Sequence, residues 1–554
     1  MEEMDSCTIL RLPGIGKPTG PCKAADMTLK PLGDAAWLVE FPDLTGEAAL
    51  ARVTGLAVAL RENKIGGVTD IVPSFASVAV HFDTVDGLAV REWIRTTEFT
   101  DKLSTGEEKL IPVRYGGEDG RDLAGVAAAL GLSSDEVVSL HSGADYTVAA
   151  VGFSPGFPYL SGLPGRLRLP RLATPRQSVP AGSVAIAAGQ AGIYPSISPG
   201  GWHLLGRTDV TLFDVHSPRP SFFLPGDRVR FCPVDRITPV KESTPTTGQR
   251  RMGTVEVIHP GGLTTVQNPG RPGHESSGVS PGGAVDRESL RMANLLVGND
   301  ESAACLECCV SGPILKFHEA TAVALVSGNG RPRRVAAGET VDFSKPAGGV
   351  RSYLAIAGGI CVPEILGSPA TDVRAGFGGM MGRPLRAGDL LEIGTPGRIP
   401  RCGDWHVGRA ADRKVIELGF LTGVQEDWFS AEARQRFRSE IYRLTPRSDR
   451  MGARLSGAGL ELCEPREMIS QPVACGSVQV PPDGQPIVLL AERQTIGGYP
   501  QIGHVISVDL PKLARAWPGT EVRFREVTWE EARQARELAE QDFKWLRTGI
   551  DLLA

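Results

Sequence analysis

Short apolar stretches separated by glycine and proline dominate the middle of the chain. From Tyr146 to Phe231, apolar and β-branched residues form runs of a few residues, and each run ends at a cluster rich in Gly, Pro or Ser. No helical spacing of apolar residues interrupts the region. Short strands between regularly spaced turns are typical of a closed or nearly closed sheet. The pattern therefore predicts a β-barrel here.

A mixed pattern precedes this region. Ala36-Trp-Leu-Val-Glu40 and Ser77-Val-Ala-Val-His-Phe82 have the character of strands, and Ala48 to Asn63 has helical spacing. We therefore expect a small α/β subdomain over residues 27–105. Residues 1–26 show no periodicity and are rich in Gly and Pro, which predicts a disordered extension.

Helix starts are marked by capping residues. Ser133-x-x-Glu136 and Thr528-x-x-Glu531 form capping boxes, and the second of these opens a C-terminal helix that runs to about Arg547. Asp286 precedes a further helical stretch, residues 287–297, and its side chain is suited to cap that stretch.

The second half of the chain repeats part of the first. Gly182-Ser-Val-Ala-Ile-Ala187 is echoed by Gly476-Ser-Val-Gln-Val-Pro481, and Pro225-Gly-Asp-Arg-Val-Arg-Phe231 returns as Pro518-Gly-Thr-Glu-Val-Arg-Phe524. Related barrels, one in each half, would explain the echoes, although shared turn chemistry is an alternative. The predicted division is a barrel over residues 106–234, a polar linker over residues 235–251 and a second half over residues 252–546.

Composition restricts the kind of partner. The 554 residues include 59 Lys and Arg against 64 Asp and Glu, without long runs of one sign, which argues against nucleic-acid binding. No stretch approaches the roughly 18 consecutive apolar residues of a membrane span. The acidic opening Met1-Glu-Glu-Met-Asp5 is unlike a secretory signal, so we expect a cytoplasmic protein.

Cys305-Leu-Glu-Cys308-Cys309 lacks the second pair of ligands that a zinc site needs, and no metal-binding residue is predicted. Small molecules or proteins are the expected partners, with homo-oligomers possible.

Familiar catalytic motifs are missing, including Gly-x-Ser-x-Gly, the phosphate-binding loop and His-Glu-x-x-His. The densest polar cluster comprises Ser448-Asp449-Arg450-Met-Gly452-x-Arg454 and Glu492-Arg493-Gln494-Thr495, which flank the strand that carries Gln479. Arginine forks bind carboxylate or phosphate, and glutamine amides pair with amides. These residues predict an anionic substrate that contains an amide. In the structural alternative, Asp449 and Arg450 only brace a turn.

Further candidates follow the glycine-rich loops. His203 could transfer protons near neutral pH, although a lone histidine is often structural. Arg271 is suited either to brace a turn or to bind a ligand. The remaining polar candidates near these loops are Gln190, Tyr194 and Arg207.

These motifs resemble a known family. Gly152-Phe-Ser-Pro-Gly-Phe-Pro-Tyr-Leu160, Val179-Pro-Ala-Gly-Ser-Val184 and Ser198-Pro-Gly-Gly-Trp202 resemble the PxpB/KipI family. The second half looks like PxpC/KipA. The motifs that carry this second resemblance are Thr264-Thr-Val-Gln267, Gly270-Arg271, Ala293-Asn-Leu-Leu-Val-Gly-Asn299, Ser352-Tyr-Leu-Ala-Ile-Ala-Gly-Gly359, Ser448-Asp-Arg-Met-Gly452, Gln479-Val-Pro481 and Gly497-Gly-Tyr-Pro500.

The resemblance implies a mainly β fold with α/β parts, in which two cyclophilin-like β-barrel halves stand in tandem with a C-terminal helix. It also implies the fused B and C subunits of a 5-oxoprolinase, which opens 5-oxo-L-proline to L-glutamate with ATP and Mg²⁺ and with a PxpA-type (LamB/YcsF family) partner. One alternative is the carboxyltransferase component of a biotin-dependent urea or amide carboxylase. Another is a KipI-like binding protein that regulates a histidine kinase.

Roles for the candidates follow from this chemistry. Phosphorylation of the lactam oxygen would weaken amide resonance before water attacks. Gln479 and Gln494 would orient the lactam, and Tyr499 or His203 would assist proton transfer. The arginines that would balance carboxylate and phosphoryl charge are Arg450, Arg454 and Arg493. The sequence departs from the family at Asn268, where Asp is usual, and at Ile496, where Thr is expected.

Overall fold

The computed structural model describes residues 27–83, 86–101, 106–237, 255–345, 348–397, 400, 402, 406–408, 415–466 and 468–553. The expected N-terminal extension and most of the expected linker, residues 238–251, lie outside these residues.

An antiparallel sheet and two helices open the described chain. The strand order is β1-β2-β4-β3, and the helix α1 packs on β3 and β4. The buried face of the sheet forms one core with α1 and α2. The elements are β1 (Thr28–Pro31), β2 (Ala36–Glu40), α1 (Gly46–Glu62), β3 (Val68–Pro73), β4 (Ser77–Phe82) and α2 (Gly87–Thr96).

Two closed barrels of identical topology follow in sequence. The order around the first is β10-β7-β6-β13-β5-β12-β9, and the order around the second is β31-β28-β27-β34-β26-β33-β30. In each barrel the last strand pairs in parallel with the first strand and antiparallel with the second. The first barrel comprises β5 (Glu108–Tyr115), β6 (Tyr146–Val151), β7 (Pro158–Ser161), β9 (Ser183–Ala187), β10 (Gln190–Ile193), β12 (His203–Arg207) and β13 (Arg228–Pro233), with α3 (Leu123–Leu130) and α4 (Ser134–Ser142) beside it. The second comprises β26 (Val415–Thr422), β27 (Tyr442–Leu444), β28 (Gly452–Ser456), β30 (Ser477–Gln479), β31 (Ile487–Leu489), β33 (Gln501–Val505) and β34 (Glu521–Glu526), with α6 (Ala431–Ser439) and α7 (Leu510–Arg515).

The sequence echoes fall on equivalent positions of the barrels. Gly182 precedes β9 and Gly476 precedes β30, and both have positive φ, +79° and +91°. A Cβ at either position would lie 2.2 or 2.3 Å from a backbone oxygen, that of Thr208 or Val505. Glycine is required at both turns for the same steric reason. The prediction of two tandem barrels is therefore confirmed.

Two five-stranded sheets form a separate lobe between the barrels in sequence. One sheet has the order β21-β17-β14-β24-β23, the other β15-β16-β22-β18-β20, and α5 packs on β18 and β22 of the second. We call this unit the sheet lobe. Its elements are β14 (Val255–His259), β15 (Leu263–Gln267), η3 (Glu275–Ser277), α5 (Arg287–Leu296), β16 (Cys305–Cys309), β17 (Ile314–Phe317), β18 (Thr321–Val326), β20 (Pro332–Val335), β21 (Thr340–Asp342), β22 (Arg351–Ile356), β23 (Ile360–Cys361) and β24 (Leu390–Ile393).

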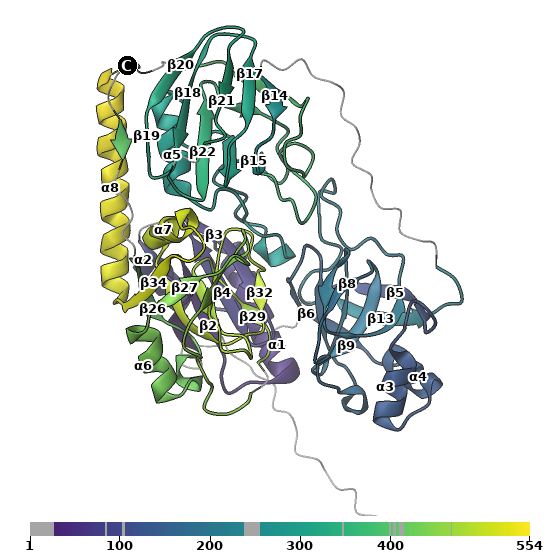
Figure 1. Cartoon of the computed structure of the whole chain (residues 1–554). Helices are drawn as coiled ribbons and strands as arrows, with labels where there is room; N and C mark the ends of the chain where they lie inside the picture. The colour runs from purple at the N-terminus through teal and green to yellow at the C-terminus, as the bar shows by residue number, and fades with distance from the viewer. Residues whose placement is uncertain are drawn as a thin grey trace, which may run out of the picture.

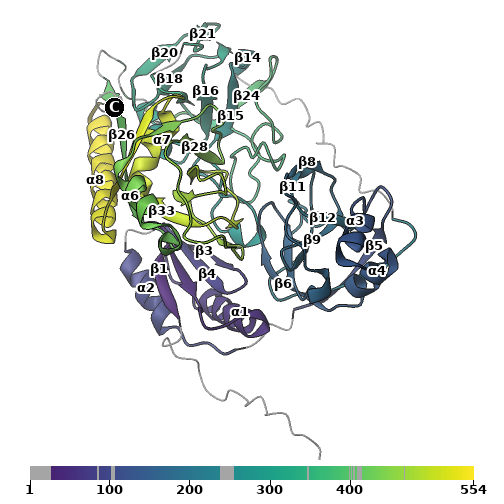
Figure 2. The same ribbon diagram turned by 60° about the horizontal axis from the view of Figure 1, so that its bottom comes forward.

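The lobes are not arranged in sequence order. The N-terminal sheet lies against the second barrel, and the first barrel stands to one side (Figures 1 and 2). Asp34 accepts hydrogen bonds from the backbone N and Oγ of Ser507, with the Oγ at 2.6 Å. Trp37 stacks on Trp529 with ring centroids 5.5 Å apart. The helix α8 (Trp529–Leu553) then runs along the second barrel and the sheet lobe (Figure 1).

The predicted helix starts are confirmed. Ser133 and Glu136 form a capping box, Thr528 and Glu531 exchange the same hydrogen bonds, and Asp286 accepts from the backbone of Ser289. Within the described ranges, no single helix is long and apolar enough to cross a membrane. The helices α3 and α4 pass that test of length and composition only as a pair, bent by 97°.

Candidate functional site

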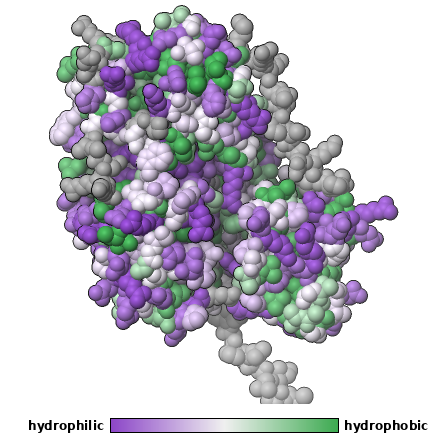
Figure 3. All heavy atoms as spheres, viewed as in Figure 1, coloured by the Kyte–Doolittle hydropathy of each residue, from purple (hydrophilic) through white to green (hydrophobic). Residues whose placement is uncertain are grey.

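The two barrels present equivalent loops to one cleft. From the first barrel come the β6–β7 loop and the β10–β12 loop, and from the second come their counterparts between β27 and β28 and between β31 and β33. Two loops of the sheet lobe, around residues 278–280 and 372–375, complete the walls. The hydropathy surface is mainly hydrophilic along the boundary between the first barrel and the rest of the molecule (Figure 3).

The cleft has two arms. The narrow arm, about 50 Å³, is lined by both barrels and the sheet lobe. The wide arm, about 350 Å³, is lined by the sheet lobe and the second barrel. Arg374 and Glu492 line both arms, and we call their position the junction of the arms. The narrow arm is lined by Phe153, Ser154, Pro155, Ser196, Ile197, Ser198, Gly278, Ser280, Asp372, Arg374, Ala375, Glu492, Arg493 and Gln494.

The narrow arm contains two buried serine hydroxyls. Ser154 is 7% exposed and Ser198 is 6% exposed, and the buried Oγ of each has no hydrogen-bond partner among the described residues. Buried hydroxyls are almost always hydrogen-bonded, so each of these calls for an explanation. Phe153, beside Ser154, has a φ of +67°, a strained conformation for a non-glycine residue that occurs often at functional sites. Together with the lining of the narrow arm, these features make it the candidate ligand site.

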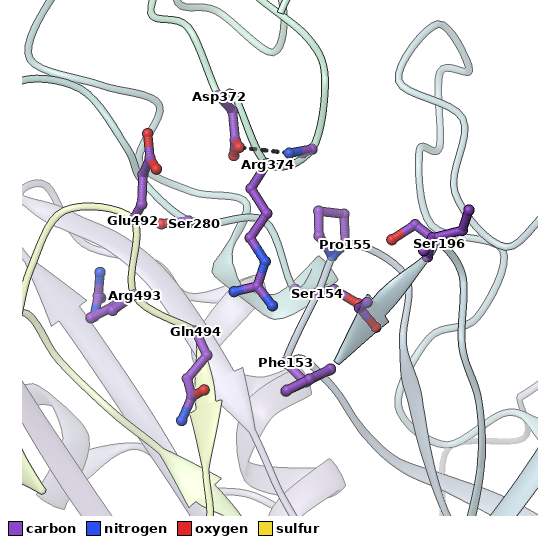
Figure 4. Close-up of a pocket in the computed structure, with 14 residues that line it drawn as sticks. Phe153, Ser154, Pro155, Ser196, Ser280, Asp372, Arg374, Glu492, Arg493 and Gln494 are labelled. Carbon is purple, nitrogen blue, oxygen red and sulfur yellow. Dashed lines mark hydrogen bonds between the residues drawn. The ribbon is translucent and has the colours of Figure 1, made fainter. Parts of the chain in front are cut away.

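Arg374 supplies an accessible cation. It comes from the sheet lobe, and its guanidinium points between Gln494 and Ser154 (Figure 4). Its Nη1 contacts Met451 Sδ at 2.8 Å, and its guanidinium lies 5.9 Å from the ring of Phe153. Among the described residues, no carboxylate forms an ion pair with it. The nearby Asp372 is occupied in part by the backbone N of Ala375, at 2.8 Å.

Arg450 is the centre of a buried ion network in the wide arm. Its Nε donates to Glu492 at 2.7 Å, its Nη1 pairs with Glu307, and its Nη2 donates to the carbonyl of Gly283 at 2.6 Å. Burial opposes the charge of Arg450, but Glu307 and Glu492 raise its pKa above the ordinary value. Arg450 therefore lines the cleft while its side chain holds the second barrel to the sheet lobe.

Glu492 differs from an ordinary surface carboxylate. Burial raises its pKa, and the nearby Asp372 raises it further, although Arg450 acts in the opposite direction. A carboxyl group with a raised pKa at the junction of two arms is suited to acid–base work.

Arg493 is held by η3, which packs against the N-terminal sheet. Its Nη2 pairs with the buried carboxylate of Glu275 in η3, and His81 of β4 lies 3.7 Å from the same carboxylate. Burial and the charge of Arg493 lower the pKa of His81 to about 3, so this imidazole is neutral. Asp70 accepts from the backbone of Ser276 at 3.0 Å. The N-terminal sheet thus positions one wall of the narrow arm.

The glutamines form a chain that leads away from the cleft. Gln494 lines the narrow arm and donates to Gln479 Oε1 at 3.5 Å, and Gln479 donates to the carbonyl of Tyr499 at 3.4 Å. The Tyr499 side chain lines a different cavity, of about 520 Å³, between Arg171 of the first barrel and Pro481 of the second.

The other predicted site residues line neither arm. His203 bonds the carbonyl of Pro170 at 2.9 Å, and Arg207 donates to the carbonyl of Ala181 at 2.8 Å. Arg454 is exposed on β28. Tyr194 and Gln190 are buried in the first barrel, where Tyr194 packs edge-on against Phe157.

Arg271 is a buried brace. It is 1% exposed, it donates to the carbonyl of Ala370, and its guanidinium lies 4.8 Å from the ring of Phe377. It therefore supports the loop that carries Asp372 and Arg374.

The two departures from the family pattern are accommodated locally. Asn268 Oδ1 accepts from Gly270 N at 2.9 Å and from Ser368 Oγ at 2.7 Å, so an amide satisfies the turn. Ile496 is fully buried in a core shared by the N-terminal sheet and both barrels.

Several residues at the cleft were not predicted as site residues. Ser154 and Ser198 lie inside the glycine- and proline-rich motifs, but nothing in the sequence shows that their hydroxyls lack partners. Glu492 belongs to the polar cluster found in the sequence, but no pattern in the sequence indicated a role for it in the site. Arg374 carries no local signal, because its position depends on the fold of the sheet lobe. No group of three or more His, Cys, Asp or Glu side chains that could hold a metal ion occurs within the described ranges.

Comparisons with known proteins agree with this architecture. The carboxyltransferase domain model for subdomains A and B matches residues 277–526, and the model for subdomains C and D matches residues 27–223. The C subunit of the 5-oxoprolinase of Escherichia coli (strain K12) is 37% identical over 308 residues, which cover 53% of this chain and 97% of that protein. The B subunit of the 5-oxoprolinase of Escherichia coli O157:H7 is 41% identical over 208 residues, covering 36% of this chain and 94% of that protein.

A solved structure spans both halves. The crystal structure of TTHA0988 is similar with a TM-score of 0.78 and 36% identity, covering 88% of this chain and 99% of that one. A urea amidolyase of Lachancea kluyveri is 30% identical over 331 residues, which cover 53% of this chain but 18% of that protein.

The fold and the two domain matches define a protein built from carboxyltransferase-type domains. Within that class, the chain belongs to the family of the 5-oxoprolinase B and C subunits, and the counterparts of both follow one another in this polypeptide.

Proposed function

We propose that this chain is a fusion of the B and C subunits of a 5-oxoprolinase, which opens 5-oxo-L-proline to L-glutamate with ATP. The observation that carries the proposal is the narrow arm, where Arg374 of the sheet lobe meets two serine hydroxyls of the first barrel that have no hydrogen-bond partner within the described ranges. A space of about 50 Å³ suits a small anionic group, such as a carboxylate, better than a whole ligand. The names of the similar proteins supply the substrate class.

Each junction residue has a proposed role. The substrate carboxylate accepts hydrogen bonds from Ser154, Ser198 and Arg374, which places the lactam ring near the junction of the arms. Gln494 pairs with the lactam amide. Glu492 takes the proton of the attacking water and returns it to the departing ring nitrogen, a role that its raised pKa favours.

The chemistry needs ATP as a second substrate. The lactam oxygen attacks the γ-phosphorus and ADP leaves. One water then adds to the activated carbon and the C–N bond breaks, which leaves a γ-glutamyl phosphate and frees the amine. A second water hydrolyses this acyl phosphate to glutamate and phosphate. Mg²⁺ bound with nucleotide phosphates needs only one or two protein carboxylates, and Asp372, which lines the narrow arm, fits that requirement.

A partner and a location complete the proposal. We propose a PxpA-type partner protein, because the similar proteins are named as single subunits of an oxoprolinase. The cytoplasm, where ATP is abundant, is the proposed location. We also propose the domain division expected from the sequence, which the bounds of the N-terminal sheet and of the first barrel support.

The test is reconstitution. The full chain, a PxpA-type partner, ATP and Mg²⁺ are mixed with 5-oxoproline, and glutamate and phosphate are measured together. Glutamate formation that depends on all components, and that is lost in Arg374→Gln, supports the proposal. Turnover of urea or another amide with carboxybiotin, without any glutamate, would overturn it in favour of a biotin-dependent carboxylase, the second candidate that the urea amidolyase similarity favours.

A further inference from the structure

The wide arm differs chemically from the narrow one. Leu263 and Val373 contribute apolar side chains to its wall although they are 40% and 39% exposed, and Met451 adds a third. Its volume of about 350 Å³ lies within the range of small-molecule sites, about 300–1,000 Å³. A ring system fits here and does not fit in the narrow arm.

Polar groups are placed at different parts of the wide arm. Arg374 stands at the junction, because it also lines the narrow arm. Arg351 is buried and donates from Nη1 to the carbonyl of Ala514 at 2.9 Å. Its Nε has no hydrogen-bond acceptor in the part of the chain that the structure describes, and Glu307 Oε1 lies 3.8 Å from it. Asp449 is exposed and lines the wide arm only. The arm therefore combines an apolar wall, cations and a carboxylate away from the junction.

We propose that the wide arm binds the nucleoside of ATP, with the triphosphate directed to Arg374 at the junction. This inference rests on the proposed function. The base packs on Leu263 and Val373. The Oδ1 of Asp449 already accepts from the backbone N of Met451 and of Gly452, so its other carboxylate oxygen accepts from hydroxyl or amino groups of the nucleoside. The terminal phosphate then stands beside the narrow arm, where the lactam oxygen attacks it and the bond from the γ-phosphorus to the bridging oxygen breaks. A nucleotide held in this way needs no glycine-rich phosphate loop, in agreement with the sequence.

The competing location is the cavity of about 520 Å³ beside Tyr499. That cavity also offers an aromatic ring and arginines, Arg171 and Arg466. However, neither Arg374 nor Glu492 lines it, and the chain of Gln494 and Gln479 separates it from the narrow arm. A phosphate bound there would not meet a substrate held by Ser154.

The experiment measures binding of the magnesium complex of AMP-PNP, a nonhydrolysable ATP analogue, to the full chain by calorimetry. Leu263→Asp places a charge on the apolar wall, and we expect at least tenfold weaker binding. The matched control is Ile258→Asp on β14, which precedes β15 in sequence but belongs to the other sheet of the lobe. Ile258 is 44% exposed and does not line the cleft, so this variant should bind as the wild type does. Photolabelling with an azidoadenine nucleotide should modify peptides that contain Leu263, Val373 or Met451.

The outcomes distinguish the nucleoside site in the wide arm from the proposed oxoprolinase activity. Equal AMP-PNP affinity in wild type and Leu263→Asp, labelling at Tyr499, or no nucleotide binding to this chain would overturn the nucleoside assignment. In each of these cases, glutamate formation by the wild-type chain with its partner would leave the proposed function standing. Binding at the wide arm without any glutamate formation would support the nucleotide site and overturn the oxoprolinase assignment.

Discussion

Glu492 accepts a hydrogen bond of 2.7 Å from the Nε of Arg450, and this contact joins the two loops that the second barrel sends into the cleft. The same guanidinium pairs with Glu307 of the sheet lobe. Two buried carboxylates therefore share this cation, and the arginine is both part of the cleft wall and a structural brace.

Replacing Arg450 with Ala should destabilise the protein strongly. The substitution leaves Glu307 and Glu492 buried without their main cationic partner, and breaking such a pair costs about 3–5 kcal/mol. We expect a large drop in melting temperature together with loss of activity. Arg454→Ala is the control, because Arg454 is exposed on the adjacent strand β28, and its free energy of unfolding should change by less than about 0.5 kcal/mol. An unchanged melting temperature in Arg450→Ala would contradict the bracing role.

Replacing Ser154 with Ala should weaken substrate binding without destabilising the protein. The Oγ of Ser154 is buried without a partner among the described residues, so its removal leaves no hydrogen bond unmade. A hydrogen bond to a charged group contributes about 1.5–3 kcal/mol, so we expect a KM for 5-oxoproline raised by about tenfold or more. Thermal unfolding and steady-state kinetics measure the two effects.

The control for this variant is Ser221→Ala. Ser221 is also buried, but its hydroxyl donates to the carbonyl of Phe223 at 2.7 Å. This substitution should lower stability and leave KM unchanged. If Ser154→Ala lowered the melting temperature as much as Ser221→Ala and left KM unaltered, the hydroxyl would have no ligand role.

Much of the fold could be predicted from the sequence because it depends on local rules. Ser133 and Glu136 cap a helix through neighbours in the chain, and Gly182 and Gly476 mark equivalent turns because no other residue fits there. The cleft depends on contacts between distant segments. The sequence indicated that Arg450 belongs to the candidate site. Its buried partner Glu307, however, is 143 positions away in the chain. No spacing rule connects them.

Lowering the pH should remove the contribution that ionised Glu307 makes to the free energy of unfolding. Burial favours the neutral form of Glu307, but Arg450 and Arg351, together with a hydrogen bond from Tyr353, hold its pKa below the ordinary value of 4.5. A carboxylate with a depressed folded pKa contributes stability above its unfolded pKa and loses it as the pH falls through the folded pKa. The free energy of unfolding of Glu307→Gln should therefore lie well below that of the wild type at pH 7, and the difference should shrink below about pH 4.5. Glu464→Gln, at an exposed position, should differ little from wild type throughout, and a constant deficit for Glu307→Gln across this pH range would contradict the argument.

Replacing Gly278 with Ala should distort the narrow arm. Gly278 has a φ of +78°, and a Cβ there would lie 2.5 Å from the carbonyl oxygen of Ser154, so the loops of the sheet lobe and the first barrel would have to separate. Gly388 has a similar φ of +86° with no heavy atom within 4 Å of a Cβ, so Gly388→Ala measures the backbone cost alone, about 1–2 kcal/mol. We expect Gly278→Ala to lose more stability than Gly388→Ala in denaturant unfolding and to raise the KM for 5-oxoproline. Gly388→Ala should keep the wild-type KM. Equal losses of stability in the two variants, with both KM values unchanged, would show that the close contact between Gly278 and Ser154 does not shape the substrate site.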